Sequence, residues 1–371
     1  MSGTEHPGAA AQHAFPSGKS ICIIGGAGFI GRHLAADLCA RACSVRIVDL
    51  FAPHWLSASR PVTYSWGDVR DLDSLSRAVK GCDILINLAA AHRDDVRPRR
   101  LYDEINVDGA RNVCRAATIN GIERILFTSS VAVYGDAPEN CDEAQPHRPT
   151  NDYGRTKSAA ERIYTHWQSD RTSPRCLVII RPTVVFGPGN RGNVHTLISQ
   201  IASGRFAMVG DGKNRKSMAY VGNVSAFICH LLSAGHGVHV YNYVDKPDLS
   251  MNELVALVRS SLGMNSRVPV RLPYPLAMGL GYGCDLLSRA IHTNLPVSRT
   301  RVDKFCTTTV FSADKALNHA HFTPAVALET ALKQTIAGEF RPGVLGINRA
   351  ANRVAPDRKA EQGGPGPALP L

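Results

Sequence analysis

The apolar residues between about position 19 and about position 182 predict alternating strands and helices. Five short segments are apolar almost throughout, namely residues 20–25, 44–50, 83–90, 124–130 and 176–182. Such runs are typical of strands that are covered on both faces of a parallel sheet. The segments between them carry apolar residues at helical spacing. Repeated strand–helix–strand units predict an α/β fold with a doubly wound sheet.

The pattern loosens after residue 182, where glycine, proline and basic residues become more frequent. We therefore expect a first domain over residues 19–181 and a second, smaller domain over residues 182–340. A segment near residues 240–245 is expected to return to the sheet. Residues 1–18 and 341–371 contain many small, polar, Pro and Gly residues, which predicts a disordered leader and a disordered tail.

Composition and charge narrow the classes of partner. The chain has 371 residues, 44% of them hydrophobic and 20% charged, as in ordinary globular proteins. Its net charge of +11 suits nucleic acid, a membrane surface or an anionic substrate such as a diphosphate. No block of basic residues is interleaved with aromatic ones, so we expect no nucleic acid partner. The ten cysteines lack zinc-binding spacing, so we expect reduced thiols and no metal.

Three equally spaced glycines, Gly25, Gly28 and Gly31, follow the first predicted strand. We expect a tight turn there and a helix that begins at about Phe29, with its free N–H groups and positive dipole end facing a pyrophosphate. A purely structural turn also needs glycine. The alternative is weakened by Asp49, which ends the second strand about 18 residues after Gly31, where an acid accepts hydrogen bonds from the adenosine ribose.

The dinucleotide expected at this turn is NAD. The carboxylate of Asp49 would repel the 2′-phosphate of NADP, although Arg32 and Arg46 lie near enough in sequence to reduce that preference. Asp68 and Val69 follow the third strand and are expected at the adenine. The further residues expected along the cofactor are Ile30, Leu88, Ala89, Ala90 and Asn106.

Tyr153 and Lys157 stand four residues apart in the segment YGRTK, so on a helix they share one face. Ser130 closes the strand 124–130. A tyrosine with its usual pKa of about 10 is a poor base at neutral pH, and a nearby ammonium group lowers that pKa. We expect Tyr153 to remove a hydroxyl proton while hydride leaves the same carbon for the nicotinamide. Ser130 would hydrogen-bond the reacting oxygen.

At these motifs the sequence resembles the extended short-chain dehydrogenases/reductases of the sugar epimerase/dehydratase type. GGAGFIG (25–31), TSSVAVYG (128–135) and YGRTK (153–157) occur in the order of that family, and the resemblance runs from about residue 20 to about residue 338. It implies a Rossmann-type sheet with a smaller C-terminal α/β substrate domain and tightly bound NAD. It also implies that Tyr153 and Lys157 contact the cofactor, that a sugar diphosphate binds between the domains, and that the protein can form a homodimer.

The residues directly after Ser130 narrow the reaction type. Dehydratases of this family carry an Asp–Glu pair there, whereas this chain has Val131 and Ala132. The resemblance therefore favours a 4-epimerase, with reduction of a 4-keto sugar nucleotide as the runner-up. An NAD-binding scaffold protein is the non-enzyme alternative, and the intact set of Ser130, Tyr153 and Lys157 weighs against it.

Longer segments such as 89–96, 181–194 and 216–223 resemble one branch of the family. That branch interconverts N-acetylglucosaminyl- and N-acetylgalactosaminyl-diphospho-undecaprenol in bacterial O-antigen assembly. Epimerases of UDP-glucose and UDP-GlcNAc share the same core, so a UDP-linked substrate remains an alternative.

The sequence indicates the residues of the substrate pocket less clearly than those of the cofactor site. Basic residues in the second domain could meet a diphosphate, or they could form a solvated loop. A lysine stands at position 216 where UDP-sugar epimerases usually have an arginine. The residues expected at the substrate are His92, Arg93, Asn193, Arg215 and Lys216, with Asp94, Asp95, Arg191 and Lys213 nearby.

The expected location rests on charge and on the expected substrate. The chain shows no secretory signal and no apolar segment long enough to span a bilayer. We expect a cytoplasmic protein that binds peripherally to the inner face of the bacterial membrane. An apolar stripe could dock on lipid head groups, although such a stripe is more often ordinary core. Its residues are Tyr274, Leu276, Met278, Leu280 and Leu286.

Overall fold

The computed structural model describes residue 15 and residues 17–56, 61–93, 96–170, 174–268, 270–291 and 299–340. Side chains within α9 at positions 286 and 288–291 are not described. Most of the expected leader and the whole of the expected tail lie outside the described residues.

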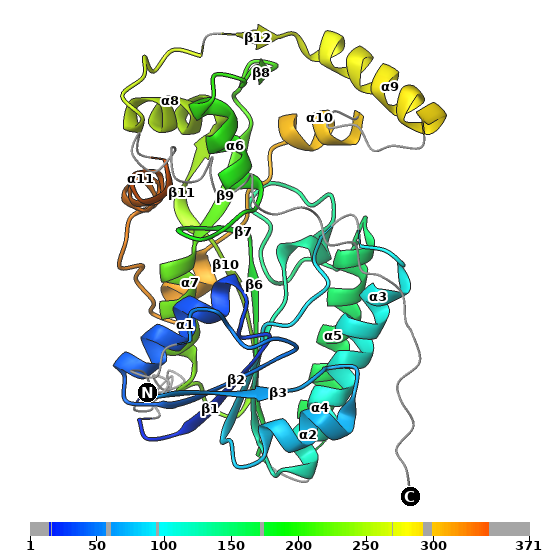
Figure 1. Cartoon of the computed structure of the whole chain (residues 1–371), viewed down its shortest axis with the longest axis vertical. Helices are drawn as coiled ribbons and strands as arrows, with labels where there is room; N and C mark the ends of the chain where they lie inside the picture. Colours follow the sequence, from blue (N-terminus) through cyan, green and yellow to red (C-terminus); the bar gives the residue numbers. More distant parts are fainter. Residues whose placement is uncertain are drawn as a thin grey trace, which may run out of the picture.

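The larger part of the molecule is built on a seven-stranded sheet in the order β10-β6-β5-β4-β1-β2-β3, in which every neighbouring pair is parallel (Figure 1). The strands are β1 (Ser20–Ile24), β2 (Ser44–Asp49), β3 (Val62–Trp66), β4 (Ile84–Asn87), β5 (Arg124–Thr128), β6 (Cys176–Pro182) and β10 (Gly237–Tyr243). The expected doubly wound α/β fold is confirmed.

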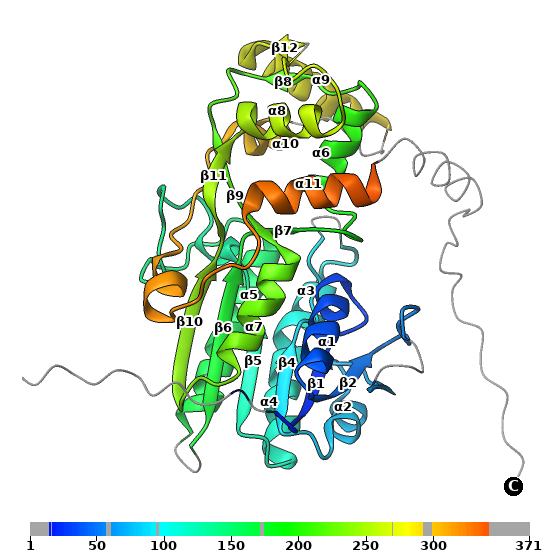
Figure 2. The ribbon, with the colours of Figure 1, turned by 90° about the vertical axis from the view of Figure 1, so that its left-hand side faces the viewer.

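Helices cover both faces of this sheet, which explains why its central strands are largely apolar. Two of them lie on one face, α1 (Phe29–Ala40) and α7 (Val221–Leu231), as Figure 2 shows. The other face is covered by α2 (Leu72–Val79), α4 (Gly109–Ile119) and α5 (Asp152–Ser169). Alternate residues of β1 pack into the hydrophobic clusters on the two faces of the sheet, because successive side chains of a strand point to opposite faces.

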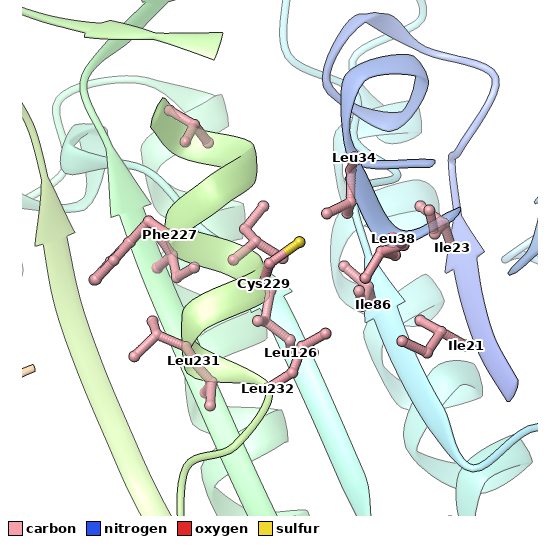
Figure 3. Close-up of a cluster of buried hydrophobic side chains, with 14 of the residues drawn as sticks. Ile21, Ile23, Leu34, Leu38, Ile86, Leu126, Phe227, Cys229, Leu231 and Leu232 are labelled. Carbon is pink, nitrogen blue, oxygen red and sulfur yellow. The ribbon is translucent and has the colours of Figure 1, made fainter. Parts of the chain in front are cut away.

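Figure 3 shows the core between the sheet and the pair α1 and α7. Ile21 and Ile23 of β1 pack with Leu34 and Leu38 of α1, and all four side chains are fully buried. Phe227 of α7 extends the same cluster. This layer therefore joins a helix from the start of the chain to one that lies about 190 residues later in sequence.

The smaller part of the molecule carries a three-stranded sheet in the order β11-β9-β7 and a two-stranded sheet of β8 and β12. Their bounds are β7 (Val184–Phe186), β8 (Met208–Val209), β9 (Arg215–Tyr220), β11 (Asp245–Ser250) and β12 (Arg271–Leu272). Three helices share a buried cluster with them, α6 (Asn193–Ala202), α8 (Met251–Ser261) and α11 (Leu328–Glu339). β10 lies between these strands in sequence but pairs with β6 of the large sheet.

The remaining described elements connect these layers. They are α3 (Arg100–Tyr102), the π-helical turn η1 (Asp103–Asp108), the 3₁₀ turn η2 (Val131–Tyr134), α9 (Tyr274–Ile291), α10 (Arg299–Cys306) and the π-helical turn η3 (Lys315–His319).

The order of the large sheet creates a crevice at one edge. β2 and β4 both pair with β1 and lie on opposite sides of it. The connection that leaves the carboxyl end of β1 therefore runs to one side of the sheet, whereas the connection that leaves β4 runs to the other. In open α/β sheets such a switch point opens a crevice where ligands bind. The glycine turn after β1 and the ends of β4 and β5 meet there.

The aromatic packing of Phe227 should be a main source of stability. Its ring is fully buried and lies 4.9 Å, centroid to centroid, from both Tyr243 and Phe322. Phe227→Ala should lower the free energy of unfolding by about 3–5 kcal/mol, because it leaves a cavity in a packed layer. The measurement is denaturant unfolding followed by fluorescence. Phe51, with 76% of its side chain exposed, is the control, and equal destabilisation by Phe51→Ala would contradict this account.

Candidate active site

The turn between β1 and α1 is too tight for side chains. Gly25 has a φ of +73°, and a Cβ there would lie 2.5 Å from the backbone nitrogen of Ala89. A Cβ on Gly31 would lie 2.2 Å from the carbonyl oxygen of Gly26. Gly28 precedes α1 and offers no side-chain cap, so the N–H groups of the first turn, from Phe29 onward, are available to an anion.

Asp49 closes this turn at the end of β2. Its Oδ2 atom accepts a hydrogen bond of 3.0 Å from the backbone N–H of Ala27, and its Oδ1 atom accepts one of 2.8 Å from that of Leu50. The carboxylate therefore lies directly beside the glycine turn. A ribose diol bound there would find an acceptor, and a 2′-phosphate would meet a negative charge.

The two arginines that could weaken this selectivity are engaged elsewhere. Arg46 donates to the carbonyl oxygens of Ala78 and Lys80, at the end of α2. Arg32 donates to the carbonyl oxygen of Pro188. Neither guanidinium group is held at the carboxylate of Asp49, which strengthens the preference for NAD.

The other residues expected at the cofactor fall into two groups. Leu88, Ala89 and Ala90 follow β4 and are partly buried, and the backbone of Ala89 faces Gly25 across the crevice. Asp68 is held by Arg70 in an ion pair of 2.6 Å, while Val69 is buried beneath α4. Contact with adenine from these two stays a prediction, and it would have to share the carboxylate of Asp68 with Arg70.

Asn106 is hydrogen-bonded within the protein, and its direct contact with the cofactor stays a prediction. Its side chain is buried, and its Oδ1 atom accepts from the N–H of Ala91 at 2.9 Å. Its Nδ2 atom donates to the carbonyl of Ala91 and to the hydroxyl of Thr156. Because these bonds use both ends of the amide, we now propose that Asn106 positions the loop after β4 against α5.

The helix α5 brings the three expected catalytic residues together. Asn151 caps it by accepting from the N–H of Gly154. Lys157 is 2% exposed, and its Nζ atom donates to the carbonyl oxygen of Thr128 at 2.8 Å. The same Nζ lies 6.0 Å from the ring centroid of Tyr153, whose hydroxyl is hydrogen-bonded to Ser130.

The pKa values of this pair differ from the expectation that lysine lowers that of tyrosine. Burial raises the pKa of Tyr153 to about 12, against which the hydrogen bond to Ser130 acts. Burial also lowers the pKa of Lys157 to about 7, although nearby Glu161 opposes this. A half-charged ammonium group is a weak source of positive potential, so in the chain alone desolvation decides the state of both groups.

A buried ion pair lies behind the catalytic residues, and the sequence patterns did not predict it. Glu161, one turn after Lys157, receives two hydrogen bonds from Arg181 at 3.0 and 2.6 Å. Ser129 donates to the same carboxylate at 2.5 Å. Arg181 also donates to Tyr134 at 2.6 Å. We propose that this network fixes the end of β5, and with it Ser130, against α5; the charged residue within the apolar run 176–182 was the signal for it.

The expected substrate residues do not all converge. His92 and Arg93 are exposed in the loop after β4, Asn193 is exposed at the start of α6, and Arg215 is exposed in β9. Lys216 has partners within the protein, and its contact with substrate stays a prediction. Its Nζ atom donates to the carbonyl oxygens of Lys304 at 2.8 Å and Thr307 at 2.5 Å, so its charge is used to hold the chain after α10.

The remaining residues expected near the pocket are also accounted for. Arg191 bonds to Glu339 at 3.0 Å and to His195 at 2.6 Å, at the end of α11. Lys213 is exposed, with its Nζ atom 3.9 Å from Asp211. Asp94, Asp95 and the side chain of Leu286 lie outside the described residues. Across the described ranges, no group of three or more His, Cys, Asp or Glu residues has the geometry to hold a metal ion.

The residues present fit NAD. A Cβ would fill the glycine turn, the carboxylate of Asp49 faces that turn, and a buried lysine lies at the far end of the crevice. Thr128, whose carbonyl receives Lys157, also carries a buried hydroxyl with no partner among the described residues. The glycine turn, the carboxylate of Asp49 and the ammonium group of Lys157 therefore all lie along the carboxyl edge of the sheet.

A family model matches residues 21–243, and its description is the NAD dependent epimerase/dehydratase family. The chain belongs to this family. The NAD cofactor and the Rossmann-type fold are thereby confirmed.

Comparison with individual relatives narrows the type of reaction. The chain is 46% identical over 323 residues to the N-acetyl-alpha-D-glucosaminyl-diphospho-ditrans,octacis-undecaprenol 4-epimerase of Escherichia coli O157:H7, covering 86% of this chain and 95% of that protein. It is 28% identical over 269 residues to the UDP-glucose 4-epimerase of Vibrio cholerae, covering 70% and 79%. The expectation of an NAD-dependent sugar 4-epimerase is confirmed at this level.

Solved structures show the same fold. The Thermus thermophilus UDP-glucose 4-epimerase complexed with NAD has a TM-score of 0.68 at 22% identity, covering 86% of this chain and 98% of that one. A UDP-N-acetylglucosamine 4-epimerase from Methanobrevibacter ruminantium, complexed with UDP-N-acetylmuramic acid, has a TM-score of 0.69 at 21% identity, covering 87% and 98%.

Cofactor choice should depend on Asp49. Asp49→Ala should weaken NAD binding by about 10- to 100-fold, since charge-assisted hydrogen bonds are lost, and should change NADP binding less. Fluorescence titration with both cofactors measures this. The matched control is Asp83→Ala. It removes a carboxylate that accepts a hydrogen bond from the N–H of Ser20, at the amino end of β1. Equal affinity of the native protein for NAD and NADP would contradict the assignment.

The buried lysine should make stability depend on pH. The pKa of Lys157 is about 7 in the folded chain against an ordinary value of 10.5, so between these values only the unfolded chain holds the proton. The free energy of unfolding should therefore rise with pH across this window.

Compared with Lys157→Met, the native protein should gain about 2 kcal/mol between about pH 7.5 and about pH 9.5. Denaturant unfolding at several pH values measures the difference. Lys80→Met removes an exposed lysine and should leave the pH dependence of the native protein in place. If the free energies of unfolding of the native protein and of Lys157→Met changed with pH in parallel, the lysine would not be buried as described.

Proposed function

We propose that this enzyme interconverts N-acetylglucosamine and N-acetylgalactosamine by epimerisation at C4, on a sugar carried by diphospho-undecaprenol. The observation that carries the proposal is the 46% identity to the Escherichia coli 4-epimerase, which extends over 86% of this chain and 95% of that protein. The grouping of Ser130, Tyr153 and Lys157 at the carboxyl edge of the sheet supports it.

The roles of these residues are inferred from their positions. When bound, NAD would supply the hydride acceptor and donor for C4 of the sugar and, in its oxidised form, a positive charge in the site. Tyr153 takes the proton of the C4 hydroxyl and gives it back. Ser130 holds the reacting oxygen through its hydroxyl. Lys157 positions the phenol and the nicotinamide ribose from its bond to Thr128.

The high pKa of Tyr153 has a consequence for this mechanism. A phenol with a pKa of about 12 is almost entirely protonated at neutral pH, so the empty chain is not poised to act as a base. A positive charge beside the hydroxyl lowers that pKa. We infer that proton removal by Tyr153 is activated only in the oxidised holoenzyme with a protonated Lys157.

Substrate recognition is proposed at the opening of the crevice. His92 and Arg93 extend from the loop after β4, and Arg215 is exposed on β9. Arg215 is the proposed diphosphate contact, since Lys216 beside it is used inside the protein. Asn193 lies at the first turn of α6 and is proposed at the sugar.

The setting proposed for this reaction is O-antigen or related polysaccharide assembly, in the cytoplasm at the inner face of the membrane. Within the ranges that the structure describes, no helix combines the length and apolar character needed to cross a bilayer. We propose peripheral binding, which the net charge of +11 supports. A homodimer is proposed by analogy with the family.

A UDP-linked sugar is the second candidate substrate. The 28% identity to the UDP-glucose 4-epimerase of Vibrio cholerae supports it. The two candidates share the chemistry at C4 and differ in the group beyond the diphosphate. Only a comparison of which substrate the enzyme turns over can therefore distinguish them.

The test offers purified protein with NAD three substrates, GlcNAc-diphospho-undecaprenol, UDP-GlcNAc and UDP-glucose, and resolves the product sugars. We expect turnover of the lipid-linked substrate at the highest kcat/KM. Tyr153→Phe should lower kcat about 10²- to 10⁴-fold, since it removes the acid–base group. Tyr241→Phe, a buried tyrosine of β10, is the control. Efficient turnover of UDP-sugars alone would overturn the lipid-linked assignment, and an active Tyr153→Phe would overturn the mechanism.

A further inference from the structure

The helix α9 carries an apolar face that points away from the protein. Figure 1 shows this helix at the far end of the smaller domain, beside β12 and α10. Leu276, Leu280 and Leu287 are 55%, 53% and 51% exposed. Spacings of four and eleven residues place them within about 40° of each other around a helix. These three residues are termed the leucine face.

Two small residues of α9 lie on its inner side. Ala277 is 2% exposed and Gly281 is buried. A helix that packs on a domain normally turns its large apolar residues inward, and the three leucines of the leucine face depart from this rule. Leu276 and Leu280 are therefore exposed and are not core residues, so the alternative that they form ordinary core is wrong for these two.

Contacts with α10 fix α9 in this orientation. The hydroxyl of Tyr274 donates to Asp303 at 3.1 Å, and the backbone N–H of Arg299 donates to Asp285 at 3.2 Å. The guanidinium of Arg299 lies 4.9 Å from the ring centroid of Tyr282. The leucine face is therefore held outward by a defined pair of helices.

The surroundings of the leucine face are basic. Residues 267–304 contain six Arg or Lys and two Asp. An outward apolar face within a basic segment of the chain is typical of a helix that lies in the interface of an anionic bilayer. The exposed basic side chains in the described part of this segment are Arg267, Arg271, Arg299, Arg301 and Lys304.

We propose that the leucine face of α9 docks on the surface of an anionic lipid bilayer, with α9 lying flat in the head-group region. This inference rests on the proposed function insofar as a lipid-linked substrate gives the docking its purpose. Charge complementarity favours lipid over a second copy of this chain, which would bring a second basic segment against the first.

Lys216 connects this surface to the candidate active site. Its Nζ atom holds the carbonyl oxygens of Lys304 and Thr307, where α10 ends. Lys216 belongs to β9, the strand that also carries Arg215, the proposed diphosphate contact. The docking helix pair and the proposed diphosphate contact are thereby linked through α10 and β9.

Vesicle flotation tests the docking directly, without substrate. The native holoenzyme is mixed at low salt with vesicles of phosphatidylethanolamine and phosphatidylglycerol, and separately with vesicles of phosphatidylcholine alone. We expect flotation with the anionic vesicles only, reduced at high salt. Leu276→Ser/Leu280→Ser should lower the partition coefficient by about tenfold or more, because two anchoring side chains are lost.

The control variant is Ile119→Ser, which removes a 63% exposed apolar side chain at the end of α4. It should float like the native protein. Thermal midpoints and NAD affinities of both variants establish that the fold is intact. Native flotation by the double variant overturns the proposal. Sedimentation without vesicles is the second readout, and a change of oligomeric state in the double variant also overturns it, by assigning the leucines to a contact between copies.

A water-soluble analogue with a short prenyl chain on GlcNAc diphosphate separates this proposal from the proposed function. Native protein and double variant should turn over this analogue equally, while the variant loses activity on undecaprenyl substrate in anionic vesicles. No turnover of either lipid-linked substrate by the native protein would overturn the proposed function, and flotation would still decide the docking surface.

Discussion

The burial of Lys157 between α5 and β5 is the interaction on which the candidate site depends. Its ammonium group has given up water for the carbonyl oxygen of Thr128, at a cost that lowers its pKa to about 7. That bond ties the catalytic helix to the strand that ends at Ser130. Behind it, the buried pair of Glu161 and Arg181 fixes the same junction. The position of Tyr153 is set by these contacts, since it lies one helical turn before Lys157.

The glycine turn is the second constraint, and it faces the first across the switch point of the sheet. Gly25 can lie against Ala89 only because neither backbone carries a bulky group there. The crevice between β1 and β4 is therefore lined by backbone at one end and by α5 at the other. A cofactor that spans it is held by fixed dipoles and by Asp49, while the reacting sugar meets the tyrosine.

Local patterns in the sequence predicted most of this arrangement. The start of α1 at Phe29 is set by glycine spacing, and the shared face of Tyr153 and Lys157 is set by a separation of four residues. Contacts between distant segments were beyond such patterns. The bonds of Lys216 to residues 304 and 307 and those of Asn106 to Ala91 join different segments of the chain, so no local spacing indicates them. The pKa of Tyr153 depends on desolvation, which sequence spacing does not report.

The central claim is that one site oxidises and reduces the same sugar carbon. The most direct measurement uses GlcNAc-diphospho-undecaprenol with tritium at C4 of the sugar, purified holoenzyme and no added reductant. The account predicts that the epimeric product keeps the tritium at C4 and that no NADH accumulates. Release of tritium into water, or a requirement for one equivalent of reduced cofactor per product, would contradict it.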